Sequence, residues 1–217
     1  MKKINIQLNK ASIEQAINHL KFLRKQIPKM MDEFLEFACR WLIKRANFYI
    51  ESADLGNLVK LKLQQGWSYN ISGGVAKLSN TAVVVKKRRY ADEDDTVPLA
   101  VLVEFGVGIV GQGNAHPNAT KAGYEYNIDT DHKKENGMWY FWTNSNELDI
   151  PLSAVEDFKG FDDHRGAQGK RMVVGTRGAQ GVMYAYNALV DAQIDLQNPN
   201  GEFANELRNL KVRYGLA

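Results

Sequence analysis

The chain has 217 residues, of which 44% are hydrophobic and 24% are charged, and its formal net charge is +3 at pH 7. These proportions are ordinary for a globular protein and supply a core that needs neither disulfides nor metals. The small net charge lacks the basic excess of a strong nucleic-acid binder. The single cysteine, Cys39, excludes an internal disulfide. Without a signal peptide or an apolar run of about 20 residues, the chain is expected to be made in the cytoplasm and to stay soluble there.

Two amphipathic helices are predicted in the first quarter of the chain. The first spans residues 12–27, where Ser12 and Gln15 form a capping box ahead of apolar residues at helical spacing. Pro28 is expected to end this helix and to occupy the first turn of the next one. The second helix, from about Lys29 to Ala53, has two adjacent apolar stripes. So wide an apolar face predicts contacts with a sheet and another helix, or with another subunit.

A change of period after Gly56 favours β-structure. The turn Ser72-Gly73-Gly74 between two alternating segments, Trp67–Ile71 and Val75–Leu78, predicts a β-hairpin. Further strands are predicted at Thr81–Lys87, Leu99–Phe105, Met138–Trp142 and Lys170–Val174. Two polar, glycine-rich segments between them, 106–137 and 143–170, are predicted as long loops.

Helical spacing returns at the C-terminal end, first over Gln180–Leu196 and then in a short terminal helix that includes Phe203 and Leu210. The order of elements indicates an α+β fold. We expect an antiparallel β-sheet, with the N-terminal pair of long helices and the C-terminal helix packed on one face. No linker or internal repeat interrupts the chain, so a single domain over residues 1–217 is predicted.

The four histidines could be metal ligands or catalytic residues, but none of them has the spacing of a known zinc motif. His132 follows Asp129 and Asp131, and His164 follows two aspartates, so a metal-dependent enzyme such as a nuclease is an alternative. Such enzymes need clustered carboxylates on rigid elements, whereas these lie in predicted loops. We therefore expect no metal, no cofactor and no enzymatic activity. Cys39 is predicted to be a buried structural thiol.

Two motifs suggest nucleotides or nucleic acids. Gly106, Gly108 and Gly111 match G-x-G-x-x-G, but the residues that follow are not expected to continue as the required helix. The aromatic run Trp139–Trp142 and the basic run Lys86–Arg89 suit a nucleic-acid-binding module. Adjacent aromatics on a strand alternate between its two faces, however, which favours a structural role.

One series of motifs carries a family resemblance. The segment Leu99–Gly108 contains Val-Glu-Phe-Gly-Val-Gly and runs into the glycine-rich stretch Ile109–Pro117, with Gly123-Tyr-Glu-Tyr126 beyond it. These segments, with Gly137–Trp142 and Gly175–Ala188 after them, resemble the tail-completion (tail-terminator, or head–tail joining) family of long-tailed bacteriophages. The sequence departs from the family pattern at Val107, where Thr is usual, and at Gly181-Val182, where Pro-Phe is usual.

The resemblance implies a structural virion protein of a phage or prophage, located in the tail or neck and in the host cytoplasm during assembly. Its implied partners are other copies of itself in a ring, usually sixfold, the tail tube protein, and a head-side connector or stopper protein. DNA would only pass through the channel, and no membrane partner is implied. Another neck or minor head protein is the alternative within the structural class.

Interface residues are predicted in the 106–117 and 143–170 loops and in the charged segment 86–95, where a basic run is followed by an acidic run. They are Glu104, Phe105, Gly106, Gly108, His116, Lys87, Arg88, Arg89, Asp94 and Asp95. For Glu104 two alternatives stand: an ion pair with a basic residue in the ring, or a solvated carboxylate at a sheet edge.

Overall fold

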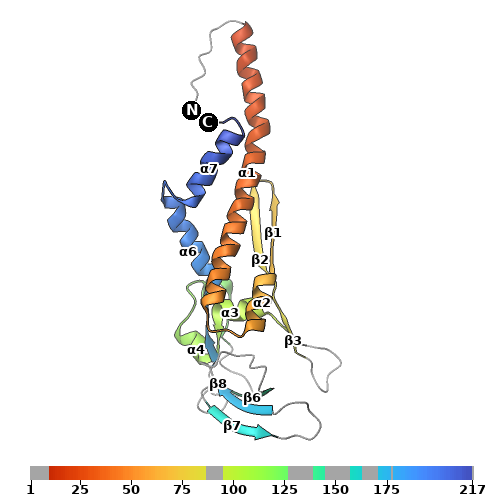
Figure 1. The fold of residues 1–217 in the computed structure, drawn as a ribbon, viewed down its shortest axis with the longest axis vertical. Coiled ribbons are helices and arrows are strands. Elements are labelled where there is room, and N and C mark those ends of the chain that lie inside the picture. Colours follow the sequence, from red (N-terminus) through yellow and green to blue (C-terminus); the bar gives the residue numbers. More distant parts are fainter. Residues whose placement is uncertain are drawn as a thin grey trace. The chain divides into compact units, whose positions relative to one another are not determined.

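The computed structural model describes residues 10–86, 95–126, 139–144, 157–162, 171–176 and 178–216 (Figure 1). These residues contain both helices and strands, which confirms the predicted α+β class. The chain forms two compact units. Unit 1 comprises Met1–Lys44, Tyr69–Leu78 and Leu189–Ala217, and unit 2 comprises Arg45–Ser68 and Ser79–Ala188. That the whole chain is a single domain stays a prediction.

The predicted helix pair is one continuous helix, α1 (Lys10–Ser52), which contains Pro28. The predicted break was therefore wrong, as was the capping box, since Ser12 lies inside the helix. A proline within a helix removes one backbone hydrogen bond, at a cost of about 3 kcal/mol. Helices in proteins are stabilised mainly by packing of their apolar face. In α1 the apolar spacing of Ile27, Met31 and Phe34 runs unbroken past Pro28, so the same face serves both sides of it.

The core of unit 1 forms where α1 meets the two C-terminal helices, α6 (Tyr184–Gln197) and α7 (Glu202–Arg213). These helices confirm the predicted terminal ones, although α6 begins four residues later than predicted. Phe203 of α7 is buried and contacts the rings of Phe34, Phe37 and Trp41 edge-on, with centroid distances of 6.0, 5.6 and 5.1 Å. Trp41 and Phe203 form one apolar cluster with Ala192 of α6.

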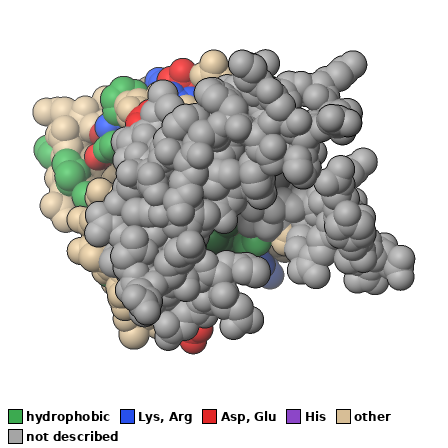
Figure 2. Space-filling view, turned by 90° about the horizontal axis from the view of Figure 1, so that it is seen from below, with side chains coloured by type: hydrophobic (Ala, Val, Ile, Leu, Met, Phe, Trp, Pro, Cys, Tyr) green, Lys and Arg blue, Asp and Glu red, His purple; other side chains and the backbone are tan. Residues whose placement is uncertain are grey.

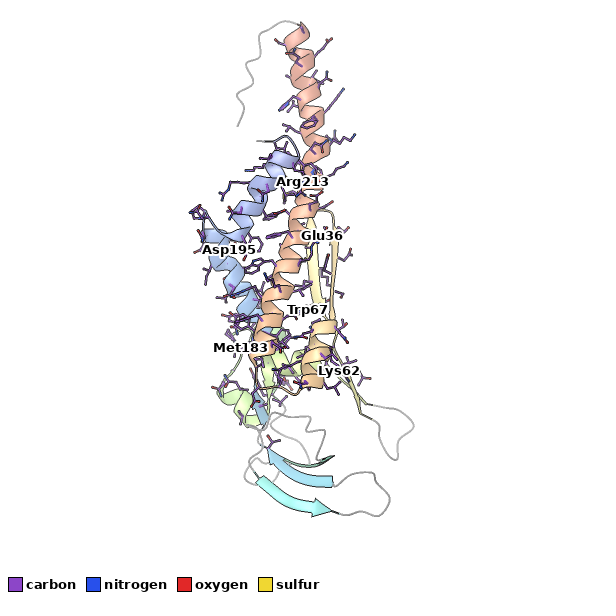
Figure 3. The ribbon with its side chains drawn as sticks, viewed as in Figure 1. Glu36, Lys62, Trp67, Met183, Asp195 and Arg213 are labelled. Atoms are coloured by element: carbon purple, nitrogen blue, oxygen red, sulfur yellow. The ribbon has the colours of Figure 1, made fainter. Side chains whose placement is uncertain are left out.

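Asp195 positions the start of α7 against the end of α6 (Figure 3). Its carboxylate accepts hydrogen bonds from the backbone N–H groups of Glu202 at 3.0 Å and Phe203 at 2.9 Å. It thereby satisfies two of the unpaired donors at the helix N-terminus. Glycine is required at position 201, just before α7, because a Cβ there would lie 2.6 Å from the Asp195 carbonyl oxygen.

The other end of α7 is tied to α1 by Glu33. The Glu33 carboxylate accepts a hydrogen bond from the Tyr214 hydroxyl and pairs with Arg213 at 2.7 Å. The Tyr214 hydrogen bond is the main cause that lowers the pKa of Glu33 below its ordinary 4.5, with Arg213 lowering it further. The same hydrogen bond raises the pKa of Tyr214.

The lowered pKa of Glu33 predicts that the contact between α1 and the end of α7 depends on pH. A carboxyl group whose pKa is lower in the folded state stabilises the fold above its unfolded pKa, and loses that contribution as pH falls through its folded pKa. We therefore expect the end of α7 to loosen as pH falls below 4.5. The ring NMR signals of Tyr214 should report this between pH 7 and pH 3. In Glu33→Gln the acid transition should disappear, whereas Asp32→Asn, an exposed neighbour on the same helix, should retain it; a transition that persists in Glu33→Gln would contradict the assignment.

The predicted hairpin is confirmed by β1 (Trp67–Ser72) and β2 (Val75–Asn80). Gly73 and Gly74 between them have φ values of +59° and +76°. Positive φ at both central residues is what a two-residue type I′ turn requires, and glycine adopts it readily. Within unit 1, Tyr69 of β1 donates a hydrogen bond to Glu36 of α1 at 3.4 Å, so this part of the hairpin lies beside α1 (Figure 1).

Unit 2 differs from the sequence prediction in two helices. The helix α2 (Asn57–Gln65) was not predicted, and Leu99–Phe105, predicted as a strand, is the helix α3. A short apolar run cannot be assigned to strand or helix by periodicity alone. In α3 the buried residues Ala100 and Glu104 are four apart and so share one helical face.

Strands of unit 2 pair in small antiparallel sheets. The predicted strand Thr81–Lys87 is represented by β3 (Val84–Lys86), which pairs with β4 (Asp95–Val97). The predicted strands Met138–Trp142 and Lys170–Val174 are confirmed by β6 (Trp139–Asn144) and β8 (Arg171–Thr176). These two lie in a sheet of order β6-β8-β7.

Both predicted loops contain regular structure among their described residues. Elements inside them are β5 (Gly106–Val107), α4 (Gly108–Gly113), α5 (Ala119–Ala122) and β7 (Asp157–Asp162). The residues after Gly111 were not expected to continue as a long helix, and α4 ends at Gly113 after only six residues. It is preceded by α3 and by β5, which pairs antiparallel with β9 (Gly178–Gln180), not by the parallel strand of a dinucleotide-binding unit. Residues 127–137, 145–156 and 163–170 of the predicted loops lie outside the described residues.

Candidate functional site

Glu104 is the centre of the most densely bonded polar cluster that we identify in unit 2. Its Oε2 accepts a hydrogen bond from the backbone N–H of Ala185 at 2.9 Å, and its Oε1 accepts one from the N–H of Tyr186 at 2.9 Å. Both amides belong to the first turn of α6, whose N–H groups have no partner within their own helix. Oε1 also lies 3.1 Å from Nε2 of His116. These four residues are called the Glu104 cluster below.

The carboxylate therefore serves as a helix cap supplied from a distant part of the sequence. A negative charge at a helix N-terminus is stabilised by the exposed N–H groups and by the helix dipole. Glu104 is buried, with 8% of its surface exposed, so it has little water to compensate for lost partners. The alternative of a solvated edge carboxylate was wrong, because α3 carries Glu104 into the interior of unit 2. The pairing with a basic residue of another subunit stays untested.

His116 holds a defined tautomer in this arrangement. Its Nδ1 accepts a hydrogen bond from the backbone N–H of Asn118 at 3.0 Å, so Nδ1 carries no proton. The ring proton then resides on Nε2 and is donated to Glu104. With 4% of its surface exposed, His116 is buried, and both of its ring nitrogens are satisfied within the chain.

Aromatic rings enclose the histidine. The ring of Phe105 lies 4.4 Å from that of His116 and stacks on Tyr124 at 4.6 Å, while Tyr186 meets His116 edge-on at 5.1 Å. The backbone N–H of His116 donates to the Tyr126 hydroxyl at 2.8 Å. The Tyr124 hydroxyl donates to the Gly106 carbonyl. The segment 114–126 is thus held against the end of α3.

A close backbone crossing places α3 beside the start of α6. A Cβ at Gly181 would lie 2.4 Å from the Glu104 carbonyl oxygen, and a Cβ at Gly106 would lie 2.4 Å from the Gly181 nitrogen. Gly106 also has a φ of +82°, which side chains rarely tolerate. The N–H groups of Val182 and Met183 donate to the carbonyls of Val103 and Glu104 at 2.8 and 3.2 Å. The two glycines therefore allow the contact that brings Glu104 to α6.

Tyr184 adds a second link between the same two helices. Its hydroxyl donates to the Ala100 carbonyl at 3.0 Å, one turn before Glu104 on α3. Its ring is buried and meets Trp67 edge-on at 5.9 Å. Burial raises the pKa of the Tyr184 hydroxyl well above its ordinary value, and the nearby Glu104 charge raises it further. The hydroxyl therefore stays protonated and keeps its hydrogen bond across the range in which proteins are handled.

The predicted interface residues fall into three groups in the structure. Glu104, Phe105, Gly106 and His116 come together in or beside the Glu104 cluster, and as intermolecular contacts they stay a prediction. Gly108 begins α4, and Asp95 begins β4. Lys87, Arg88, Arg89 and Asp94 lie outside the described residues.

Sequence reasoning missed the two backbone donors of the Glu104 cluster and the two tyrosines beside it. The amides of Ala185 and Tyr186 leave no signal in a sequence, because any residue other than proline supplies a backbone N–H. Tyr124 and Tyr126 stand in the motif Gly123-Tyr-Glu-Tyr126, which could have identified them as partners of the Glu104 segment.

The other sequence candidates form no site among the described residues. Within the described part of the chain no three His, Cys, Asp or Glu side chains gather as a metal site, while the Asp129–His132 run lies outside it. Cys39 is buried, and burial raises the pKa of its thiol, with Glu36 adding to the effect.

On the face drawn in Figure 2, the coloured part of the surface carries Lys and Arg beside Asp and Glu, so charges of both signs mix there. None of the described helices is long and apolar enough to cross a membrane.

Comparison with protein-family models, curated proteins and solved structures found no match to this chain. The role of the Glu104 cluster therefore follows from its own chemistry. The carboxylate, both imidazole nitrogens and the Tyr184 hydroxyl have partners inside unit 2. An arrangement of this kind fixes helices relative to one another.

Proposed function

We propose that the chain is a structural protein of a tailed phage or prophage, which forms a ring at the head-proximal end of the tail tube and joins the tail to the head-side connector. The observation that carries the proposal is the Glu104 cluster itself. The family resemblance depends in part on segments 99–117 and 175–188, which are far apart in sequence, and together they supply Glu104, His116 and the capped start of α6.

The physical character of the cluster suits a structural role. A ring subunit presents two different surfaces to its two neighbours, and each must keep its shape while the ring closes. A buried carboxylate that accepts two backbone N–H groups and an imidazole N–H holds its helices in one geometry. A surface that is already rigid loses little conformational entropy when a neighbouring subunit binds to it, which favours ring formation.

The decisive experiment mixes the purified chain with tail tubes of the phage or prophage that encodes it. We expect electron micrographs to show a ring on one end of each tube, and tubes to stop elongating when the protein is present. A chain that leaves tube ends bare and elongation unchanged would overturn the proposal. If it then retarded DNA in a gel with a steep dependence on salt, the nucleic-acid-binding alternative would replace it.

A pair of charge reversals tests the predicted contact segment within this proposal. Arg88→Glu lies in the charged segment 86–95, whereas Lys121→Glu lies at an exposed position of α5 and serves as the matched control. We expect Arg88→Glu to reduce the fraction of capped tube ends and Lys121→Glu to leave it unchanged. Equal capping by both variants would exclude the segment as a contact, even if capping itself is confirmed.

A further inference from the structure

The hydrogen bonds of His116 depend on the protonation state of its ring. A neutral imidazole has one nitrogen that donates and one that accepts, whereas a protonated imidazole donates from both. In the structure Nε2 of His116 lies 3.1 Å from the Glu104 carboxylate, and Nδ1 accepts the Asn118 N–H at 3.0 Å. The contact with Glu104 suits either protonation state, because a carboxylate accepts from a neutral and from a charged imidazole. The contact with Asn118 suits the neutral ring alone.

A proton on Nδ1 of His116 would set two donors against each other. The new N–H group would point at the Asn118 N–H, and the 4% exposure of His116 leaves little water to accept either hydrogen. A buried donor without an acceptor is costly. Asn118 directly precedes α5, and the Ala119 N–H donates to the His116 carbonyl at 2.9 Å. The Asn118 amide therefore cannot turn away unless the start of α5 moves with it.

The segment 114–126, which contains α5, is attached to α3 through a small set of contacts. Two are the ring contacts of His116 with Glu104 and Phe105, and a third is the hydrogen bond from the Tyr124 hydroxyl to the Gly106 carbonyl. A segment with few buried contacts opens at a lower free energy than the whole domain unfolds. A change at His116 is thus able to release this segment while the rest of unit 2 stays folded.

The same proton has the opposite effect on the contact between His116 and Glu104. A positive imidazole attracts the carboxylate more strongly than a neutral one does, most of all where water is scarce. The two bonds from the N–H groups of Ala185 and Tyr186 to the carboxylate do not involve the imidazole. Protonation of His116 should therefore leave the cap of α6 in place.

Titratable side chains surround His116 from α3, α6 and the segment after α5. Those that contact the ring, its own N–H or the adjoining Phe105 ring are Glu104, Tyr186, Tyr126 and Tyr124. Lys121 and Glu125, in the same segment as His116, are exposed. Tyrosine hydroxyls keep their proton below about pH 9. Of the groups in contact, His116 and Glu104 are therefore the two whose charge can change between pH 8 and pH 4.

We propose that His116 is a pH-sensitive switch, whose protonation on Nδ1 releases the segment 114–126 from α3 while Glu104 keeps its hold on the start of α6. Histidine is the side chain whose charge ordinarily changes between pH 5 and 8, and such a change can shift a local two-state element. The inference does not rest on the proposed function, because every group involved lies within one chain.

The test is an NMR titration of the full-length protein, labelled with ¹⁵N, from pH 8 to pH 4. At pH 8 the His116 ring should carry its proton on Nε2 and none on Nδ1. As the pH falls, Nδ1 should gain a proton in the same interval in which the Asn118 amide loses protection from hydrogen exchange. Relative to its intrinsic rate, that amide should exchange about tenfold faster or more. Ala185 and Tyr186 should keep their protection throughout this interval.

Three results would overturn the proposal. The first is a His116 ring whose Nδ1 stays without a proton to pH 4 while unit 2 remains folded. The second is protonation of Nδ1 with no change in exchange at Asn118. The third is loss of protection at Ala185 and Tyr186 together with Asn118, which would assign the transition to Glu104 or to unfolding of unit 2.

A pair of histidine substitutions provides a second, independent check. In His116→Gln the side-chain amide can still donate to Glu104 but takes up no proton, so protection of Asn118 should no longer depend on pH. His19→Gln removes the histidine of α1 in unit 1 and is the matched control, in which the transition at Asn118 should be unchanged. A transition at Asn118 that persists in His116→Gln would show that another group causes it.

Discussion

Replacing Glu104 by Ala is expected to lower the free energy of unfolding of unit 2 by about 3–5 kcal/mol, the range typical of a buried charged network that loses one partner. The substitution removes the acceptor of two backbone N–H groups and of the His116 N–H. These donors lie in a region from which water is largely excluded, so each lost bond leaves a desolvated group. A matching exposed carboxyl group, Glu125, should tolerate the same change with little effect.

Hydrogen exchange gives the sharpest measurement, because the amides of Ala185 and Tyr186 are themselves the bonded donors. In Glu104→Ala both should exchange much faster, while amides at the centre of α7 in unit 1 should not change. Glu104→Gln retains the shape but offers only one acceptor oxygen, so a loss of about 2 kcal/mol is expected. Unchanged protection of Ala185 and Tyr186 in Glu104→Ala would contradict the capping role.

Coupling between Glu104 and His116 can be separated from the capping bonds by a double-mutant cycle. The two side chains are in direct contact, so their effects should not be additive. His116→Ala removes one of the three bonds to the carboxylate but leaves the two backbone donors paired. Its loss of stability should therefore be smaller than that of Glu104→Ala, and the double variant should cost less than the sum of the two.

The sequence was most informative where local chemistry alone decides the structure. The hairpin at Gly73-Gly74 needs two residues of positive φ between alternating segments, and both requirements are visible in the sequence. The helix that contains Phe203 is visible by its periodicity, and its partner α1 by the rows of large apolar residues. The predicted helix break at Pro28 was wrong because the sequence shows only the local cost of the lost backbone hydrogen bond. The packing that offsets this cost depends on tertiary structure.

The candidate site was predictable in part. The motif around Val103–Gly106 and the glycines after it identified the right segments, and His116 was among the named residues. Assigning Leu99–Phe105 to a strand made a solvated sheet edge one of the two alternatives for Glu104, since alternate residues of an edge strand face outward. On a helix the same residue falls on the buried face with Ala100, and its true partners are backbone amides about 80 residues away.

The apolar pattern of α1 is a related case, because the predicted break at Pro28 divided it into two parts. Each half shows apolar residues at helical spacing, yet the unbroken alternation of fours and threes from 13 to 41 appears only when Pro28 lies within one helix. In the continuous helix these residues form one apolar stripe, whose C-terminal part packs against α6 and α7 and whose N-terminal part is exposed.

Replacing Gly181 by Ala is expected to lower the free energy of unfolding of unit 2 by about 3 kcal/mol, at the upper end of the usual cost of overpacking. The added Cβ would lie 2.4 Å from the Glu104 carbonyl oxygen and 2.6 Å from the Phe105 carbonyl carbon. Both neighbours are backbone atoms at the end of α3, so they cannot rotate away as a side chain would. The crossing must open, and the capped turn of α6 must move away from Glu104.

Substitutions at two other glycines separate the cost of steric overlap from the cost of backbone strain. Gly113 has open space around the position of a Cβ and no positive φ, so Gly113→Ala should be neutral or should stabilise by about 0.5 kcal/mol. Gly123 has open space but a φ of +65°, so Gly123→Ala should cost about 1 kcal/mol for backbone strain alone. Gly181→Ala should exceed both and should also speed exchange at Ala185 and Tyr186. If it proved as stable as Gly113→Ala, the close crossing that brings Glu104 to α6 would be wrong, and the structural basis of the proposed ring subunit would fall with it.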